Sequence, residues 1–303
     1  MKAIGIDLGG TKIEVQLYAD DWSLAEARRV ATPGDYDGLV AALADQVGWG
    51  RAQGGDLPVG VAAAGLVHPG TGAALTANLP ASGRPLPGDL RAAAGGEITY
   101  INDCRALALS EAAFGAGRAH RGVAALIMGT GVGGGFAYDG HLLDGPSTTG
   151  GEFGHTALPA AWVQSHGLPL HRCGCGRMGC LETYLAGPGL SRLARELTGR
   201  AATPPEIAAA RREAFAPAWG AWCALAAEAL RMIALTLDPD IVVLGGGLSQ
   251  IDGVVADIEA ALDGVRLGDF PMPQVALAEG GAASGGRGAA LAAWQAAEAL
   301  SHG

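Results

Sequence analysis

The amino-acid sequence predicts an α/β protein built from two lobes of related topology. A strand, a turn of glycine and threonine, and a second strand follow one another near residues 4–17, and the same pattern returns near residues 124–138. Helical periodicity dominates the second half of the 303 residues and alternates there with short apolar strands. Apolar residues make up 49% and charged residues 17% of the chain, a balance typical of folded globular proteins.

The individual elements follow from local patterns. Apolar runs and alternation predict strands at residues 3–8, 13–17, 59–65, 97–102, 123–130, 136–138 and 241–244. Helical spacing predicts helices at residues 36–47, 103–114, 180–195, 205–213, 216–237 and 284–300. Pro239 is a sharp stop for the helix at 216–237. The irregular stretch 78–88, rich in proline and glycine, is expected to be a loop with a binding role.

Charge and cysteine usage exclude several classes of protein. The net charge of -10 and a pI of about 5.1 argue against a protein that binds nucleic acid by neutralising phosphates. Because neither a signal peptide nor a transmembrane stretch is visible, we expect no membrane partner and a cytoplasmic location. Three of the five cysteines fall between residues 173 and 180, which indicates metal binding in a reducing compartment.

Both turns of glycine and threonine have the chemistry of phosphate binding. Backbone N–H groups of such turns can face a phosphate, and the threonine adds a hydroxyl donor. An acidic residue at the end of the first strand can hold Mg²⁺, usually through water. Each turn alone is also compatible with a plain hairpin, but two of them in one chain favour a nucleotide such as ATP. The candidate ligands of ATP and its phosphates are Asp7, Gly9, Gly10, Thr11, Lys12, Thr130, Gly131 and Gly133.

A third glycine run follows the strand at 241–244. The base and ribose of a nucleotide could lie against the flat backbone of Gly246 and Gly247. A simple strand-to-helix turn is nearly as common an explanation for such a run, so the sequence leaves both open.

Asp103 follows Asn102 directly at the end of a predicted strand. A kinase that acts on a hydroxyl needs a carboxylate to orient that hydroxyl and accept its proton. An aspartate at a strand-to-helix junction is also a good helix N-cap. With two phosphate-binding turns in the same chain, we favour catalysis by Asp103 over capping.

The cysteine cluster predicts a zinc site. Cys173, Cys175 and Cys180 lie within eight positions, and three thiolates with one imidazole make a closed tetrahedral site. His155 is the preferred fourth ligand because it lies in a glycine-flanked turn. His166 and His171 are closer to the cysteines along the chain and remain alternatives.

Taken together, these motifs resemble the ROK family of sugar kinases and repressors. The motifs occur in the family's order along essentially the whole chain: D-L-G-G-T-K, N-D, G-T-G-V-G-G-G, G-E-F-G-H, C-G-C-G-x-x-G-C-x-E and D-P-D-x-V-V-L-G-G-G-L-S. The resemblance implies the actin-like ATPase fold, related to ribonuclease H, with two α/β lobes and a cleft. It also implies an N-terminal lobe at residues 1–118, onto which the final helix at 288–303 packs, and a larger lobe at 119–287 that carries the zinc loop.

The resemblance further implies roles for individual residues. Asp103 matches the catalytic base of the family. The positions that match residues holding the sugar are Gly65, Asn102, Asp103, Glu152, His155 and Glu182. Zinc at His155 and the three cysteines shapes the sugar pocket and does no chemistry, while ATP and Mg²⁺ supply the phosphoryl group. Because dimers are common in the family, a homodimer is the expected assembly.

The choice of sugar depends on the loop at residues 77–86, which resembles that of bacterial N-acetylglucosamine kinases. Asn78 and Ser82 offer small polar side chains where related fructokinases and glucokinases have a tryptophan, which leaves room for an acetamido group. We therefore expect phosphorylation of N-acetylglucosamine at its 6-hydroxyl, with fructose, glucose and N-acetylmannosamine as alternatives. A sugar-sensing repressor of the family is disfavoured, because the first hairpin begins near residue 4 and leaves no room for a helix-turn-helix.

Overall fold

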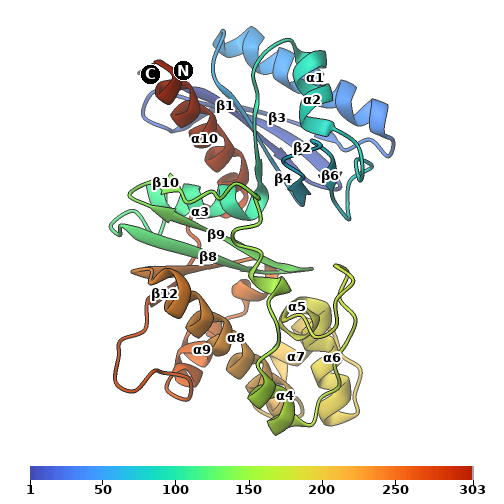
Figure 1. Ribbon diagram of the computed structural model, residues 1–303, viewed down its shortest axis with the longest axis vertical. Coiled ribbons are helices and arrows are strands. Elements are labelled where there is room, and N and C mark those ends of the chain that lie inside the picture. Colours follow the sequence, from blue (N-terminus) through green and yellow to red (C-terminus); the bar gives the residue numbers. More distant parts are fainter. Residues whose placement is uncertain (302–303) are drawn as a thin grey trace. The chain divides into compact units, whose positions relative to one another are not determined.

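A computed structural model describes residues 1–301 and divides the chain into two compact units. Unit 1 comprises Met1–Gly115, Gly140–Gly150 and the chain from Gly280 onward, and unit 2 comprises Ala116–Asp139 and Gly151–Glu279. Each unit combines a mixed sheet with helices, so the predicted α/β class is confirmed (Figure 1).

The sheet of unit 1 has the strand order β3-β2-β1-β4-β7. The bounds of its strands are β1 Ala3–Leu8, β2 Lys12–Tyr18, β3 Leu24–Ala31, β4 Val59–Ala63 and β7 Thr99–Asn102. β1 pairs with β2 in an antiparallel hairpin, whereas β1, β4 and β7 run parallel. The carboxyl ends of these three strands therefore meet at one edge, which is the usual ligand-binding edge of such a sheet.

Helices cover both faces of this sheet. Ile4, Ile6 and Leu8 alternate to one face and share a core with α1 (Tyr36–Gly54) and α2 (Leu86–Ala94). α3 (Asp103–Phe114) and α10 (Ser284–Ser301) pack on the other face, where α10 lies beside β1 in Figure 1. The predicted terminal helix thus belongs to unit 1 over the residues described, and residues 302–303 of that prediction lie outside them.

The contact of α10 with the sheet depends on glycines. A Cβ atom at Gly60 of β4 would lie 1.9 Å from the carbonyl oxygen of Ala289, and one at Gly5 of β1 would lie 1.9 Å from that of Gly286. On the other side of the helix, a Cβ atom at Gly288 would lie 1.9 Å from the carbonyl oxygen of Ala106 in α3. Backbone therefore meets backbone where any side chain would force the elements apart.

Unit 2 is built around the strand order β9-β8-β11-β12. Its strands are β8 Gly122–Met128, β9 Val132–Tyr138, β11 Ile241–Gly245 and β12 Gln274–Leu277. Its helices are η1 Phe153–His155, α4 Ala160–His166, α5 Glu182–Leu185, α6 Gly187–Thr198, α7 Pro204–Ala209, α8 Ala216–Leu237, η2 Gly247–Gln250 and α9 Val254–Leu262. The short elements of unit 1 are β5 Leu66–Val67, β6 Ala74–Leu75, β10 His141–Leu142 and η3 Gly281–Ala283.

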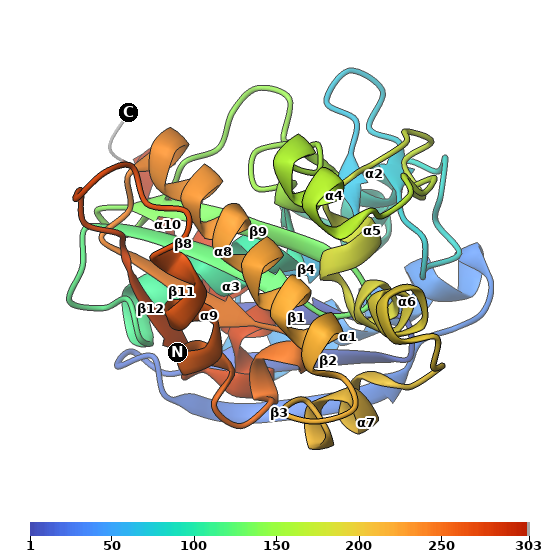
Figure 2. The same ribbon diagram turned by 90° about the horizontal axis from the view of Figure 1, so that it is seen from below.

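The long helix α8, seen lengthwise in Figure 2, forms the centre of the core of unit 2. Trp222 is fully buried on it and donates its indole N–H to the carbonyl of Leu185. α8 is the single described helix with the length and composition to cross a membrane. Half of its apolar window is buried, as in the core helix of a globular protein, so it is weak support for a membrane span.

Several predicted elements need correction. The glycine run at 131–135 is part of β9 rather than a long turn, because Gly133–Gly135 pair with β8. The helix predicted at 180–195 is two helices, α5 and α6. Pro188 lies in the first turn of α6, and a proline there prevents one continuous helix. The helix at 205–213 ends four residues earlier, at Ala209. Strand β3 was not predicted, because it is mostly exposed and lacks apolar alternation.

The lobe bounds at 1–118 and 119–287 stay a prediction. In the structure, Gly140–Gly150 belongs to unit 1 although its neighbours on both sides belong to unit 2. The buried Arg105 of α3 holds this segment by donating to the carbonyl oxygens of Thr148 and Gly150. The Thr148 hydroxyl also donates to the carbonyl of Val67.

Candidate active site and metal centre

The edge of the unit 1 sheet brings two carboxylates together. Asp7 lies near the end of β1, and Asp103 begins α3 directly after β7. The sequence offered Asp103 as a possible cap of α3, but the structure gives that role to the residue before it. Asn102 is the cap, because its Oδ1 accepts from the backbone N–H of Cys104 at 2.9 Å and of Arg105 at 3.3 Å. Asp103 is thereby left available for another task.

Burial changes the acidity of both carboxylates. It raises the pKa of Asp103 above the ordinary value of an aspartate, although hydrogen bonds from Cys104 act in the opposite direction. It also raises the pKa of Asp7; the charge of Lys12 lowers it and that of Asp103 raises it. Two like-charged carboxylates at one sheet edge are a favourable environment for a divalent cation, which prefers oxygen ligands.

Gly65 and Thr76 lie beside Asn102. The Asn102 amide donates to the carbonyl oxygen of Gly65 at 3.0 Å, and Gly65 adopts a φ of 103° that favours glycine. A Cβ atom there would lie 3.1 Å from the Cβ of Thr76. The Thr76 hydroxyl is buried and has no hydrogen-bond partner among the described residues, which is a costly state unless a ligand supplies one. Sequence reasoning missed Thr76, and a buried threonine gives no signal in a single sequence.

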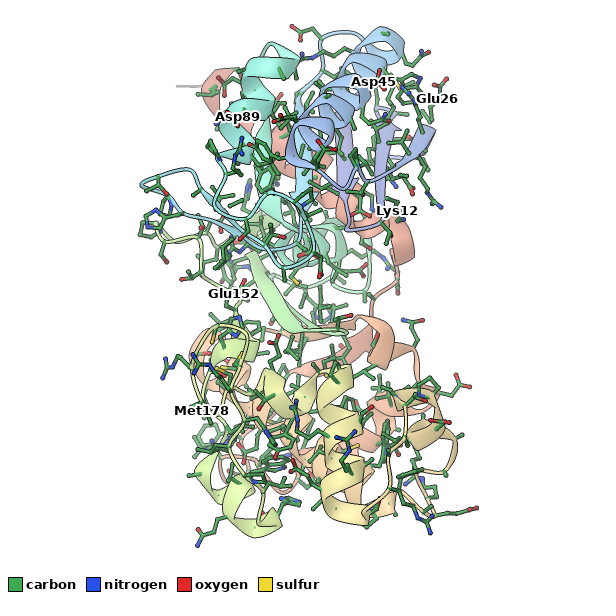
Figure 3. All side chains as sticks on the ribbon, turned by 90° about the vertical axis from the view of Figure 1, so that its right-hand side faces the viewer. Lys12, Glu26, Asp45, Asp89, Glu152 and Met178 are labelled. Carbon is green, nitrogen blue, oxygen red and sulfur yellow. The ribbon has the colours of Figure 1, made fainter. Side chains whose placement is uncertain are left out.

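The first phosphate turn is a tight hairpin. The Gly9 N–H donates to the carbonyl of Lys12 at 2.9 Å, and Thr32 holds the carbonyl of Gly9 at 2.7 Å. Lys12, labelled in Figure 3, forms an ion pair with Glu14 at 3.3 Å. Exposed Thr11 lies at the tip of the turn.

The substrate-loop candidates lie near this hairpin within unit 1. A Cβ atom at Gly10 would lie 2.9 Å from the carbonyl oxygen of Asn78. The Asn78 and Ser82 side chains are both exposed, and Ser82 forms a β-bridge with Ala74. The predicted loop at 78–88 ends earlier than expected, because α2 begins at Leu86.

The second phosphate turn adjoins a pocket of unit 2. The carbonyl of Gly129 accepts from the N–H of Gly187 at 2.8 Å, which fixes the turn against the start of α6. The pocket has a volume of about 690 Å³, and Thr130, Pro188, Gly247 and Gln250 are among the residues that line it. This volume lies within the usual range for small-molecule sites.

The other predicted nucleotide ligands of unit 2, Gly131, Gly133 and Gly246, are not among the residues that line this pocket. Gly246 shapes the turn after β11, since a Cβ atom there would lie 2.4 Å from the carbonyl oxygen of Met128. Gly131 lies against Glu182, whose Oε2 would be 2.8 Å from such an atom, and Gly133 lies inside β9.

His155 and three cysteines form a compact cluster in unit 2. Their ligand atoms all lie within 4.8 Å of one another. The Cys173 sulfur lies 3.6 Å from His155 Nδ1, and the sulfurs of Cys175 and Cys180 are 3.5 Å apart. Zinc bonds of about 2.1–2.3 Å place tetrahedral ligand atoms about 3.5–3.8 Å apart. The predicted ligand set therefore fits a zinc ion.

A small hairpin builds this cluster. The Cys173 N–H donates to the carbonyl of Arg177 and the Gly179 N–H to that of His171. Exposed Met178, labelled in Figure 3, lies on the second leg of the hairpin, where it is bridged to Arg172. A bridge between Ala157 and Cys180 brings the segment after His155 alongside. Burial raises the pKa of the Cys173 thiol to about 12 and also raises that of Cys180, so metal binding must displace protons there.

The two alternative histidines have other partners. His171 Nε2 lies 2.7 Å from the Glu196 carboxylate, and His166 Nδ1 lies 2.9 Å from the carbonyl oxygen of Trp162. His155, in contrast, directs Nδ1 toward the cysteines, while its Nε2 lies 3.9 Å from Glu152. One ring can thus serve the metal with one nitrogen and leave the other for Glu152 or a ligand.

Glu182 joins the cysteine cluster to the second phosphate turn. Its Oε2 accepts from the backbone N–H of Val132 at 2.9 Å, and its Oε1 lies 3.5 Å from the Cys173 sulfur. Both carboxylate oxygens are therefore placed by the elements on either side.

The family model described as the ROK family matches residues 3–296. The chain belongs to the ROK family. The actin-like ATPase fold expected for this ROK protein is confirmed by the family and by the structural match below.

Two curated relatives of this ROK protein are kinases of N-acetylated amino sugars. An N-acetylgalactosamine kinase of Shewanella is 38% identical over 293 residues, which cover 95% of each chain. An N-acetyl-D-glucosamine kinase of Escherichia fergusonii is 37% identical over 295 residues, covering 95% of this chain and 97% of the relative. The expectation of a ROK kinase is therefore confirmed.

A solved ROK structure is also similar over nearly the whole chain. It is a ROK glucokinase of Streptomyces griseus in complex with glucose and AMPPNP. It is 29% identical, has a TM-score of 0.73, and matches 95% of this chain and 97% of its own. That protein holds a sugar and an ATP analogue in one complex.

Proposed function

We propose that this ROK protein transfers the γ-phosphoryl group of Mg-ATP to the 6-hydroxyl of N-acetylglucosamine. The observation that carries the proposal is the likeness, at 38% and 37% identity, to two kinases whose named substrates share a 2-acetamido group. The small polar side chains of Asn78 and Ser82 agree with a sugar of that kind.

Unit 1 supplies the base and part of the sugar site in this proposal. Asp103 accepts the proton of the sugar hydroxyl, a role for which a raised pKa and freedom from capping are favourable. Asn102 and the turn at Gly65 hold ring hydroxyls, and the unpartnered Thr76 hydroxyl gains a sugar oxygen. Asp7 holds Mg²⁺ through water, and the turn at Gly9–Lys12 binds phosphate oxygens.

Unit 2 supplies the remaining contacts. The pocket beside Thr130 takes the nucleoside, with Gly247 in its wall, and the turn at Thr130 and Gly131 binds phosphates. Glu152, Glu182 and the free nitrogen of His155 hold ring hydroxyls. Bound zinc fixes the hairpin that carries Cys173 and thereby the place of Glu182.

A substrate panel tests the proposal. We expect kcat/KM with Mg-ATP to be highest for N-acetylglucosamine and at least tenfold lower for glucose and fructose, because a site that hydrogen-bonds an amide leaves groups unpaired without it. A higher kcat/KM for glucose or fructose contradicts the acetamido reading. The 38% identical relative makes N-acetylgalactosamine the second candidate substrate. This sugar has the same acetamido group and differs in the direction of its 4-hydroxyl, so a preference for it would change the contact to that hydroxyl only.

We further propose a cytoplasmic location and a homodimer. The alignments cover 95% and 97% of the two kinase relatives, and the net charge of -10 does not favour nucleic acid. A reducing compartment keeps the zinc thiolates available. Size-exclusion chromatography with light scattering tests the dimer, and a mass near 30.3 kDa would contradict it.

A further inference from the structure

Two arginines of unit 2 that have no role in the proposed function line a small pocket. The pocket has a volume of about 150 Å³, and Arg172, Arg192 and Glu182 contribute charged side chains to it. It adjoins the larger nucleotide pocket, because Thr130 and Pro188 line both. The 150 Å³ equals the liquid volume of about five water molecules at about 30 Å³ each, which is enough for one small polyatomic ion.

Arg192 is held in place before any ligand arrives. It donates from Nη1 to the carbonyl oxygen of Thr183, and its guanidinium lies 5.9 Å from the ring centre of Tyr184. The Tyr184 hydroxyl in turn donates to Glu196 at 2.6 Å, and its oxygen also lies 2.9 Å from the carbonyl oxygen of Pro169. A guanidinium fixed in this way loses little conformational entropy when it binds an anion.

Arg172 lies on the hairpin that carries the zinc-binding cysteines, and its backbone is bridged there to Met178. Its side chain is exposed, and within residues 1–301 no hydrogen bond or ion pair engages its guanidinium. Arg105 and Arg211, by comparison, are paired with Asp144 and Asp257. Arg172 is therefore an available cation at the mouth of a polar pocket.

The backbone adds to the positive character of the pocket. α6 begins at Gly187, no side chain caps its start in the part of the chain described, and Gly189 of its first turn lines the pocket. The first N–H groups of a helix lack partners inside it and carry partial positive charge. The single acidic residue of the lining, Glu182, already accepts a hydrogen bond from Val132.

We propose that this pocket is a binding site for a phosphate group, either as inorganic phosphate or as the phosphate ester of a phosphorylated sugar. Two guanidinium groups and the Thr130 hydroxyl match the several acceptor oxygens of one phosphate. Because the pocket shares Thr130 with the nucleotide pocket, an occupant there competes with the donor phosphates and slows turnover.

Direct titration with inorganic phosphate tests the site without any sugar or nucleotide. The zinc-loaded wild-type protein is compared calorimetrically with Arg172→Met, and we expect the affinity for phosphate to fall about tenfold or more with the loss of a charge-assisted pair. Arg177→Met is the matched control, since Arg177 lies on the same hairpin, is exposed and does not line the pocket. Equal affinities in wild type and Arg172→Met, or an equal loss in Arg177→Met, would overturn the proposal.

A second pair of variants guards against a folding artefact. Arg192→Lys keeps the charge but not the fork of donors, and we expect it to weaken phosphate severalfold. Arg195→Lys, one turn along α6 and exposed, is expected to bind like wild type. Unchanged melting temperature and zinc content establish that each variant is folded, and a folded Arg192→Lys protein with full affinity contradicts the site.

Inhibition of turnover separates the two sources of phosphate. If the occupant is inorganic phosphate alone, Arg172→Met relieves inhibition by phosphate and leaves inhibition by the sugar 6-phosphate unchanged; if the pocket also takes the product ester, the variant relieves inhibition by both, because the ester carries the same phosphate group. Relief of neither refutes the site. Because the titration needs no turnover, failure of the proposed kinase activity leaves this result interpretable.

Discussion

Asn102 and Asp103 divide two tasks between neighbouring positions. Asn102 caps α3 and holds the carbonyl of Gly65, so its side chain fixes the strand end. Asp103 has its carboxylate buried at the cost of a raised pKa. A carboxylate that stays desolvated although the Cys104 N–H donates to it at 2.9 Å is costly to a protein, and such groups concentrate at functional sites.

Replacing Asp103 with asparagine is expected to lower kcat by about 10²–10⁴-fold, because an amide has the same shape but cannot accept the proton. Steady-state assays with coupled ADP detection measure this, and sugar affinity should change little. Asp35→Asn is the control, since Asp35 caps α1 and lies among exposed residues. Near-normal turnover in Asp103→Asn would show that the base lies elsewhere.

The same substitution is expected to stabilise the protein at neutral pH. The folded-state pKa of Asp103 lies above its unfolded value of about 3.9, so the folded state favours the protonated form. The resulting loss of stability is absent below that unfolded value and complete once the pH exceeds the folded pKa. Melting temperatures of the two proteins should therefore coincide near pH 3.5 and diverge toward pH 7, with Asp103→Asn higher; a lower value at pH 7 contradicts this account.

Site residues that belong to a sequence motif could be predicted. Site residues that are recognisable only from their burial or their partners in the folded chain could not. The four atoms of the His155 and cysteine cluster meet as their spacing predicted. The choice of His155 over His171 had no basis in spacing, because it follows from the pairing of His171 with Glu196, 25 positions away. Thr76 is recognisable only from its unpartnered hydroxyl, which is a property of the folded chain.

The zinc hairpin is an element whose shape depends on its metal. Cys175→Ser removes one of four ligands, and we expect purified protein to lose its zinc and to bind sugar more weakly through displacement of Glu182. Elemental analysis and the KM for sugar measure the two effects. Cys223→Ser, on α8 and outside the cluster, should retain zinc. Wild-type protein that carries no zinc when purified without chelator contradicts the assignment.

Helix α10 is sensitive to single methyl groups. Gly288→Ala places a Cβ atom against the carbonyl oxygen of Ala106, and we expect it to lower the free energy of unfolding by about 1–3 kcal/mol. Gly48→Ala in α1 is the control, because its Cβ atom meets nothing within 4 Å and alanine gains helix propensity of up to about 1 kcal/mol. Urea denaturation measures both, and equal stability of the two variants refutes the close contact.

Elements with strong periodicity were predictable, and those shaped by tertiary contacts were not. The sequence predicted α8 at residues 216–237 and α3 at 103–114 with the bounds observed. β3 gave no signal because an exposed edge strand needs no apolar face. The first part of β9 was mistaken for a turn, since its glycines are selected by contacts such as that of Gly134 with the carbonyl of Ala125.

At the scale of the whole molecule, unit 1 is assembled from separated stretches of chain, whereas the core of unit 2 contains no residue of α10. A chain that ends at residue 283 should therefore lose the order of unit 1 and keep that of unit 2. Limited proteolysis followed by mass spectrometry would detect rapid cleavage within residues 1–115 and slow cleavage around Trp222 and Val242. Protection of residues 1–115 as in the full-length chain contradicts this.

The glycine contacts of α10 also set an order of events during synthesis. A ribosome makes about 5–20 residues per second, so roughly 170 residues and about 10–30 s separate the completion of Gly115 from the arrival of Ser284. During that interval β1 and β4 lack the helix that covers their glycine-lined face, while the strands and helices of unit 2 are being made. The half of the protein that is made first is therefore finished last, and its nascent sheet is the surface on which a chaperone would act.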